Sequence, residues 1–426
     1  MRNVIITLAI GFLLSHAAGA EQYKLLKSAG ILDVKKGSLS ADQDILIDGN
    51  RILAIGSESE IRAEHLISED QIEIIDLDGL TVMPGLIDAH SHVLLHPYNE
   101  TSWNDQVLKE TRAERSARAV GHLKATLDAG FTSLRDLGSE GAGYDDVGIK
   151  RALQKGVMVG PRLIVAGRAI VATGSYGPKG FDLSHEITLG AEPADGDDLI
   201  RVVRDQIGKG ADVVKVYADY RWGPTGEARP TFSLEEFNSI VKTANSSGRD
   251  VVAHSATAEG MRRAILAGVK SIEHGDGGTD EIFKLMKDNN TIYCPTLTVT
   301  EAIAEYGGWK KGVDPDTNGV RRKHAAMTSA IKSGVTICNG SDVGPYTHGD
   351  NLRELKLLVE YGLSVEKTIQ AATMVGAELM NKGDELGQVK VGYLADLIAV
   401  DGNPLENLDI LSSPKMIMLD GNFYKK

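Results

Sequence analysis

The sequence predicts an α/β fold: a (β/α)₈ TIM barrel with a small β-sandwich domain built from both chain ends. Two observations support this prediction. In the middle of the 426-residue chain, apolar strand-like runs alternate with helical patterns. Both ends instead carry short alternating runs that are typical of antiparallel strands. Because separated strand-rich ends usually pair with each other, we expect one small domain at the two termini.

The first segment, residues 1–20, is typical of a secretory signal peptide. Arg2 precedes an apolar run over residues 4–14, and Ala18-Gly19-Ala20 forms a cleavage site of the A-x-A type. The run is too short for a comfortable transmembrane span. The alternative is a buried N-terminal strand or helix. We expect a periplasmic or secreted protein that begins near Glu21 and keeps no membrane attachment after cleavage.

The predicted β-sandwich comprises residues 21–82 and 385–426. Its strand-like runs lie at residues 23–26, 44–47, 51–55, 72–76, 395–400 and 416–419. Asp48-Gly49-Asn50 separates two of these runs and is a hairpin turn signal.

The predicted barrel comprises residues 83–384. Its candidate strands lie at residues 86–90, 131–137, 162–167, 212–218, 250–254, 270–274, 291–295 and 335–339. Two of its helices have clear ends. Ser233 and Glu236 form a capping box that begins one helix, which stops at Gly248, and the next runs from Thr257 to Gly268.

The composition indicates a soluble globular protein and excludes some partners. Hydrophobic residues make up 42% of the chain and charged residues 25%, and the net charge is −13. An acidic surface argues against binding to nucleic acid or anionic membranes. Two cysteines are too few for a disulfide framework. Cys294 and Cys338 each lie in an apolar run, so we interpret them as small buried hydrophobes rather than a bridge or a nucleophile.

Residues able to bind a metal occur at five of the predicted barrel strands. They are His90 and His92 after the first strand, Lys215 in the fourth, His254 and His274 after the fifth and sixth, and Asp342 after the eighth. A lone histidine at a strand end more often bonds a backbone carbonyl. A barrel, however, brings the carboxyl ends of all its strands to one rim, where active sites form. The pattern therefore predicts a metal centre, because imidazole suits Zn²⁺ and similar ions.

These residues stand in motifs that resemble the amidohydrolase superfamily. The motifs are PGLIDAHSH at residues 84–92, the strand lysine, HSATAEGMRRAILAGVKSIEHG at 254–275, GSD at 340–342 and the tail at 386–397. The resemblance covers nearly all of the chain after residue 20. Within the superfamily it is strongest to the prolidase-like (Xaa-Pro dipeptidase) and imidazolonepropionase-related subgroup.

The resemblance implies a binuclear site with two divalent metal ions, Zn²⁺ being the expected one. His90, His92 and Asp342 would hold one ion, and His254 and His274 the other, with an N6-carboxylated Lys215 between them. Asp342 would be the catalytic residue that takes a proton from the attacking water and gives it to the leaving nitrogen. The alternatives are a mononuclear site and a Lys215 that forms only a salt bridge. Imidazolonepropionase-type members lack the bridging lysine, so its presence favours two metals.

Two residues in the loops after the strands are candidates for substrate binding. Many prolidase-like relatives have Thr-Gly-Gly-His after the third strand, where this sequence has Thr173-Gly174-Ser175-Tyr176. Tyr176 either donates a hydrogen bond to the scissile carbonyl in place of that histidine or packs across the barrel mouth. Arg221 either clamps a substrate carboxylate or is a solvated surface residue.

The expected function is hydrolysis of the amide bond of a dipeptide or an N-acyl amino acid by a metal-activated hydroxide. The resemblance also implies a homo-oligomer that acts on small molecules. The alternative is a cyclic amidohydrolase or lactonase that uses the same site. A catalytically inactive binding subunit is the rival from a different class, and a missing ligand would favour it.

Overall fold

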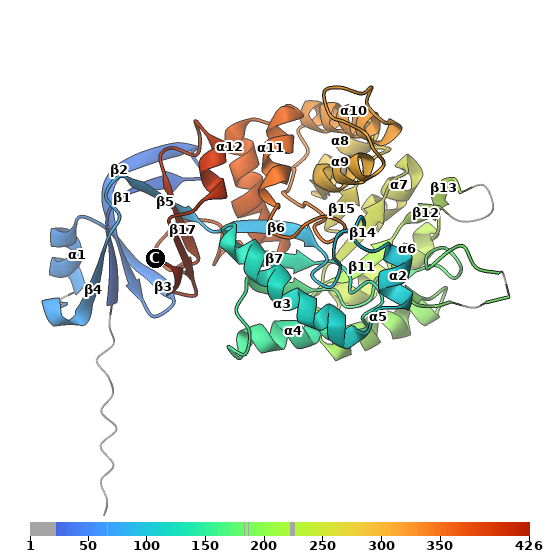
Figure 1. The fold of residues 1–426 in the computed structure, drawn as a ribbon, viewed down its shortest axis with the longest axis horizontal. Helices are drawn as coiled ribbons and strands as arrows, with labels where there is room; N and C mark the ends of the chain where they lie inside the picture. The colour runs from blue at the N-terminus through green and yellow to red at the C-terminus, as the bar shows by residue number, and fades with distance from the viewer. Residues whose placement is uncertain (1–22, 66, 183, 186, 222–225) are drawn as a thin grey trace, which may run out of the picture.

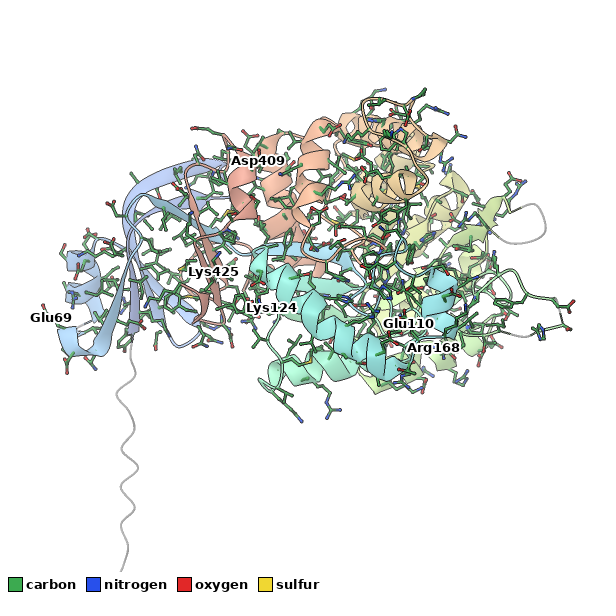
Figure 2. The ribbon with its side chains drawn as sticks, viewed as in Figure 1. Glu69, Glu110, Lys124, Arg168, Asp409 and Lys425 are labelled. Atoms are coloured by element: carbon green, nitrogen blue, oxygen red, sulfur yellow. A yellow bond between two sulfur atoms is a disulfide. The ribbon has the colours of Figure 1, made fainter. Side chains whose placement is uncertain are left out.

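The computed structural model describes residues 23–65, 67–182, 184–185, 187–221 and 226–426. The predicted signal peptide, residues 1–20, lies outside the described residues. Figure 1 shows a small sheet beside a larger body in which helices surround strands. Charged side chains such as Glu69 and Asp409 lie on the outside of both parts (Figure 2). None of the helices in the described ranges is both long enough and apolar enough to cross a membrane.

Parallel strands of the larger body form a closed ring. One sheet has the order β6-β7-β8 and the other β10-β9-β11-β14-β15-β16. Their bounds are β6 (Leu86–Ser91), β7 (Phe131–Asp136), β8 (Arg162–Val165), β9 (Ile170–Val171), β10 (Glu192–Pro193), β11 (Val214–Tyr217), β14 (Val251–Ser255), β15 (Ser271–His274) and β16 (Ile292–Cys294). The backbone N–H of Asp212 donates to the carbonyl of Val165 and joins the two sheets at one seam. The curled sheet with helices outside it is a TIM-barrel-type fold.

The other seam of the ring is less regular than the sequence predicts. Residues 335–339 do not form a strand, because Ile337 alone makes a bridge, to Tyr293 in β16. The next residue with a bridge is Val343, which pairs with Ser91 in β6. Between them, the N–H of Asn339 donates to the carbonyl of Ala371 rather than to a strand. Backbone hydrogen bonds still hold the residues that follow beside β6. The N–H of Ala89 donates to the carbonyl of Asn339, and the N–H of Asp342 donates to the carbonyl of His90.

Helices cover the outside of the ring (Figure 1). They are α2 (Trp103–Leu108), α3 (Arg112–Asp128), α4 (Asp145–Gln154), α5 (Asp198–Lys209), α6 (Leu234–Asn245), α7 (Ala258–Ala267), α8 (Asp280–Asp288), α9 (Leu297–Tyr306), α10 (Asn318–Ser333), α11 (Leu352–Glu360), α12 (Val365–Gln370), the π-helical η2 (Ala371–Val375) and α13 (Gly376–Leu379). The capping box of Ser233 and Glu236 begins α6 as predicted. Thr257 caps α7, and Gly268 ends it in the left-handed conformation, with φ 92°. A short hairpin, β12 (Asp219–Arg221) with β13 (Ala228–Pro230), extends from the end of β11.

Strands from both chain ends share the small sheet, in the order β19-β18-β17-β5-β1-β2-β3 with β4 paired to β1. They are β1 (Tyr23–Asp33), β2 (Ser38–Asp48), β3 (Arg51–Gly56), β4 (Ile72–Asp76), β5 (Leu80–Pro84), β17 (Leu397–Asp401), β18 (Met416–Leu419) and β19 (Asn422–Lys425). The predicted turn separates β2 from β3, and Gly49 has a φ of 54° there. All of these strands are joined by hydrogen bonds into one sheet. The sheet is irregular at β1, whose register with β2 shifts on either side of Ala29. The first part of β1 pairs with β4, and Gly30 and Ile31 pair with β5. Short helices α1 (Glu58–His65), η1 (Glu69–Gln71) and η3 (Leu408–Ser412) connect these strands.

The interpretation of the cysteines as unpaired is wrong. Both are fully buried, as expected, but Cys294 and Cys338 form a disulfide with their Cα atoms 5.0 Å apart. The reason is the seam described above. Because Ile337 bridges Tyr293, the residues that follow each of them lie side by side on neighbouring segments. The disulfide therefore links the end of β16 to the segment that leads to Asp342.

Candidate metal centre

His90 and His92 turn their Nε2 atoms toward Asp342. On the other side of each ring, Nδ1 of His90 lies 2.8 Å from Oε2 of Glu273, and Nδ1 of His92 lies 2.8 Å from the carbonyl oxygen of Gly138. These acceptors favour a proton on Nδ1, which leaves the lone pair on Nε2. The two Nε2 atoms lie 3.6 and 3.3 Å from Oδ1 of Asp342. Nitrogen and carboxylate ligand atoms that converge in this way fit a bound cation, which would take the place of a proton between them.

His254 and His274 complete the group of imidazoles. Nδ1 of His274 lies 3.9 Å from Oδ2 of Asp342 and 2.8 Å from Oγ1 of Thr296. The rings of His254 and His274 lie 4.4 Å apart, and the His254 ring stacks on Tyr217 at 4.4 Å. One ligand atom each from His90, His274 and Asp342 lies within 4.8 Å of the others. The structure thus brings together all four predicted histidines and the aspartate.

The protonation states of these groups follow from burial and charge. Burial lowers the pKa of His254 and of His274 well below the usual value, so both are neutral imidazoles that are able to bind a metal. Burial also lowers the pKa of His92, but the hydrogen bond and the charge of Asp342 outweigh burial and raise it to about 9. Without a metal ion, a proton on Nε2 of His92 therefore faces Asp342, and a bound cation would replace it. Burial raises the pKa of Asp342, but the nearby imidazoles and Lys215 lower it by more. The net pKa lies below the usual value, so the carboxyl group is ionised.

Lys215 lies inside the ring on β11 and is only 1% exposed. Burial lowers the pKa of its ammonium group to about 8, against the opposing charges of Glu273 and Asp342. Burial, together with the charge of Lys215, lowers the pKa of His90 to about 4 and that of His254 well below its usual value. With this pKa, roughly a tenth of the amine is neutral at pH 7.

The comparisons with known proteins agree with this geometry. The model of the amidohydrolase family matches residues 81–423. The chain belongs to the amidohydrolase family. This amidohydrolase is 31% identical over 420 residues to an ochratoxinase from Aspergillus niger, a match that covers 91% of the chain and 83% of the relative. An imidazolonepropionase from Bacillus cytotoxicus is 22% identical over 365 residues, covering 78% of the chain and 77% of that protein.

Solved structures lead to the same assignment. A Xaa-Pro dipeptidase with methionine bound in its active site has a TM-score of 0.84 and 31% identity, covering 95% of this chain and all of that one. The predicted membership in the prolidase-like part of the superfamily is therefore confirmed. Together, the family and these neighbours support a metal-dependent hydrolase that acts on carbon–nitrogen bonds.

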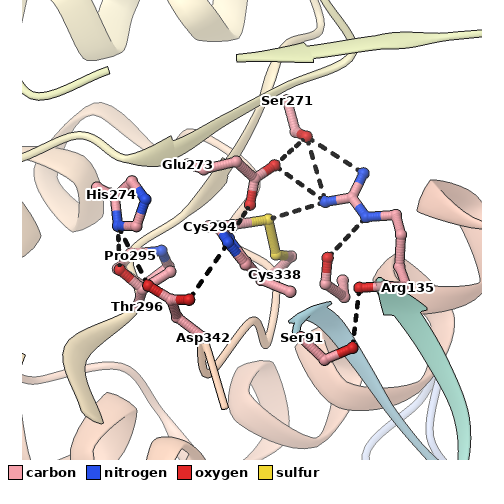
Figure 3. A network of polar contacts seen from close by, with 12 residues as sticks. Ser91, Arg135, Ser271, Glu273, His274, Cys294, Pro295, Thr296, Cys338 and Asp342 are labelled. Carbon is pink, nitrogen blue, oxygen red and sulfur yellow. Dashed lines mark hydrogen bonds and ion pairs between the residues drawn. A yellow bond between two sulfur atoms is a disulfide. The ribbon is translucent and has the colours of Figure 1, made fainter. Parts of the chain in front are cut away.

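A buried ion pair beneath the centre was missed in the sequence. Nη2 of Arg135 in β7 lies 3.0 Å from Oε1 of Glu273 in β15, and both side chains are fully buried. Figure 3 shows that Ser271 joins this pair and that Arg135 also reaches the backbone of β6, where its Nε donates to the carbonyl of Ala89. Because Glu273 also bonds Nδ1 of His90, the pair fixes the orientation of that imidazole. The available signal was a pair of opposite charges, an arginine and a glutamate, each inside a predicted barrel strand.

Tyr176 and Arg221 lie apart from the group around Asp342. The hydroxyl of Tyr176 donates to Oε2 of Glu140 at 2.6 Å, and the Tyr176 ring lies 4.6 Å from that of Tyr217. Tyr176 is therefore at the edge of the centre, one ring beyond the tyrosine that stacks on His254. Arg221 is exposed at the end of β12, where its guanidinium lies 5.7 Å from the ring of Tyr220.

Proposed function

We propose that this amidohydrolase hydrolyses the amide bond of a dipeptide or an N-acyl amino acid at a site for two divalent metal ions, with Zn²⁺ as the expected metal. The observation that carries the proposal is the meeting of four imidazoles, a carboxylate and a buried lysine at one end of the barrel. Imidazole nitrogens and a carboxylate are ligands of the kind that Zn²⁺ binds.

In this proposal His90, His92 and Asp342 hold one ion, and His254 and His274 hold the other. Bound metal ions would supply positive charge that polarises the substrate carbonyl and makes a water molecule more acidic. The ring orientations support this assignment for His90 and His92, since Glu273 and Gly138 keep both Nδ1 atoms protonated and leave Nε2 free.

Lys215 would bridge the two ions as a carbamate. A neutral lysine amine adds CO₂ to form N–CO₂⁻, and the proton that leaves the nitrogen goes to solvent. The lowered pKa of Lys215, about 8, supports this step because it provides neutral amine near neutral pH. The carbamate would offer two anionic oxygens in place of a single positive charge.

Asp342 would carry the proton during the reaction. Its carboxylate accepts the proton of the attacking water as the new C–O bond forms. It then gives this proton to the amide nitrogen as the C–N bond breaks. The product is a free amine and a carboxylic acid, and Asp342 returns to its ionised state.

A cyclic amidohydrolase or lactonase is the second candidate, favoured by the similarity to an imidazolonepropionase. The presence of Lys215 favours the first proposal, because imidazolonepropionase-type members resemble this chain but lack that lysine. The chain keeps every candidate ligand, which argues against an inactive binding subunit.

A substrate panel tests the proposed function. Protein supplemented with Zn²⁺ should release free amino acids from dipeptides or from their N-acetylated forms, measured by liquid chromatography. Chelation should abolish this activity, and renewed addition of Zn²⁺ should restore it. Cleavage of cyclic amides or lactones alone would establish the second candidate, and no cleavage of any member would point to a binding subunit.

We also propose that the protein is exported to the periplasm or secreted. The disulfide between Cys294 and Cys338 supports this proposal, because disulfides persist in oxidising compartments. N-terminal sequencing of the exported protein should begin near Glu21, and alkylation after denaturation should find no free thiol unless a reductant is added. An intact Met1 on material from the cytosol would refute export, and two free thiols in exported protein would refute the disulfide.

A further inference from the structure

Glu140 is a buried carboxylate at the edge of the candidate metal centre. It lies in the loop that follows β7 and is only 3% exposed. Oε2 accepts hydrogen bonds from Nε1 of Trp103 at 2.8 Å and from the hydroxyl of Tyr176 at 2.6 Å. Oε1 has no hydrogen-bond partner within the described part of the chain. Neither the motifs nor the proposed mechanism uses this residue.

The loop holds Glu140 in a strained conformation. Its φ is 47°, in the left-handed region that residues other than glycine rarely adopt. His274, Thr296 and Asp342 also have positive φ angles, and they belong to the metal centre. The other residues of this kind in the described ranges, glycine aside, are Asn290, Asn381 and Asp420, whose residue types tolerate the conformation. Backbone strain of this kind is concentrated at functional sites, so Glu140 belongs with the first group.

Arg115 lies close to the Glu140 backbone but does not pair with the Glu140 carboxylate. Arg115 donates to the backbone carbonyls of Leu94, Ser139 and Glu140, at 2.9, 3.2 and 2.7 Å. These bonds hold the loop in place and occupy the guanidinium with main-chain acceptors. Among the described residues, no ion pair joins the Glu140 side chain to a lysine, arginine or histidine. The Glu140 carboxyl group thus lies buried at the edge of the site, with no ion pair to it among the described residues.

The hydrogen bond to Glu140 decides what Tyr176 is able to do. A phenol has one proton, and the Tyr176 proton is directed at the carboxylate. The same proton is therefore not free for a scissile carbonyl, which was one of the two roles that the sequence allowed for Tyr176. What the Tyr176 oxygen offers a substrate is a lone pair, so it acts as an acceptor for an N–H group.

The surroundings of Tyr176 also favour a cation. Its ring lies 4.6, 4.8 and 5.1 Å from the rings of Tyr217, Tyr220 and Trp103. Aromatic faces attract ammonium and guanidinium groups, as the Lys179 ammonium 5.1 Å from the Tyr220 ring illustrates. This aromatic group leads directly to His254 through Tyr217.

We infer that Glu140 and Tyr176 recognise the protonated amino group of the substrate and so favour dipeptides over N-acyl amino acids. This inference rests on the proposed function and chooses between its two substrate classes. Tyr176 accepts a hydrogen bond from the ammonium group. Glu140 is a positioning residue, which orients the Tyr176 hydroxyl and supplies the compensating negative charge.

Glu140→Gln tests the inference, because it keeps the size of the side chain and removes its charge. The comparison uses leucyl-alanine and N-acetyl-leucyl-alanine, with kcat and KM measured for each. The wild type should prefer the free dipeptide. The variant should lose about ten- to a hundredfold in kcat/KM for it, mainly through KM, and far less for the acetylated form. Tyr176→Phe should lower the same preference.

Glu110→Gln is the matched control. Glu110 is another largely buried carboxylate, and its Oε1 lies 2.8 Å from Nε2 of His96. This control should keep the wild-type preference between the two substrates. Glu140 and His92 both lie beside Gly138. A Cβ atom added at Gly138 would be 3.2 Å from Oε1 of Glu140 and 3.4 Å from Cε1 of His92. An equal loss for both substrates in Glu140→Gln would mean that Glu140 supports the metal centre instead, and it would overturn the inference.

A binding measurement separates this inference from the proposed function. Leucine amide and N-acetyl-leucine amide are titrated into Zn²⁺-supplemented protein by calorimetry. Tighter binding of leucine amide in the wild type, lost in Glu140→Gln, supports amino-group recognition even if no peptide is cleaved. Equal affinity of the wild type for the two amides would overturn the inference even if peptides are cleaved.

Discussion

Asp342→Asn should lower kcat for the best substrate by about a thousandfold or more while most of the metal remains bound. Asparagine keeps the size of the side chain and one carbonyl oxygen, but an amide does not accept and return a proton near neutral pH. A positioned general acid–base group contributes typically about 10²- to 10⁴-fold, and loss of the anionic charge adds to this effect. Steady-state kinetics and elemental analysis on the same preparation measure both quantities.

The appropriate control for this variant is Asp288→Asn, on the surface of α8, where Asp288 pairs with Lys284 at 2.5 Å. It should leave both kcat and the metal content unchanged. Near-normal turnover in Asp342→Asn would exclude the proton-carrying role. If the variant loses its metal together with its activity, Asp342 acts mainly as a metal ligand. That result would contradict the expected loss of turnover with retention of metal.

Lys215→Ala should reduce bound metal from close to two equivalents per chain to one or fewer, and turnover by about a thousandfold. The reason is that the bridging carbamate cannot form without the amine, so the two cations would have no anionic group between them. Elemental analysis after dialysis measures the metal. Protein from which CO₂ has been removed should also lose activity, and bicarbonate should restore the wild type but not the variant.

Lys150→Ala provides the comparison for this experiment. Lys150 forms an ion pair with Asp212 at 2.7 Å, just before the same strand that carries Lys215. It should retain two metal equivalents, as judged on protein with an unchanged circular dichroism spectrum. If Lys215→Ala also retains two equivalents, or if the wild type itself binds only one, the bridging assignment is wrong.

The sequence predicted the barrel strands and the ligand candidates for one physical reason. Each ligand stands at the carboxyl end of an apolar run, or within one in the case of Lys215, and a barrel gathers these ends at one rim. The prediction of an eighth strand was wrong, because a strand requires pairing with neighbouring segments as well as apolar residues of its own. Residues 335–339 have the apolar texture of a strand, but only Ile337 makes a bridge, and the N–H of Asn339 donates to Ala371 in η2.

Contacts between distant segments were harder to predict from composition. The disulfide of Cys294 with Cys338 depends on a single bridge one residue earlier in each segment, which a run of apolar residues does not reveal. The same is true of Glu140. Its role as the acceptor for Tyr176 depends on a loop conformation that Arg115 stabilises through main-chain carbonyls. No local pattern marks such a residue.

The small sheet imposes an order of events on biosynthesis. Its strand β5 pairs with β1 on one side and β17 on the other, and Lys426 forms an ion pair with Glu73 at 2.7 Å. β1 and β5 are synthesised long before β17, so the edge of β5 that pairs with β17 stays uncovered until β17 has been made. During that interval β5 presents an unpaired apolar edge, the kind of surface that aggregates or recruits a chaperone. Completion of this sheet is expected to be among the last events in the maturation of the chain.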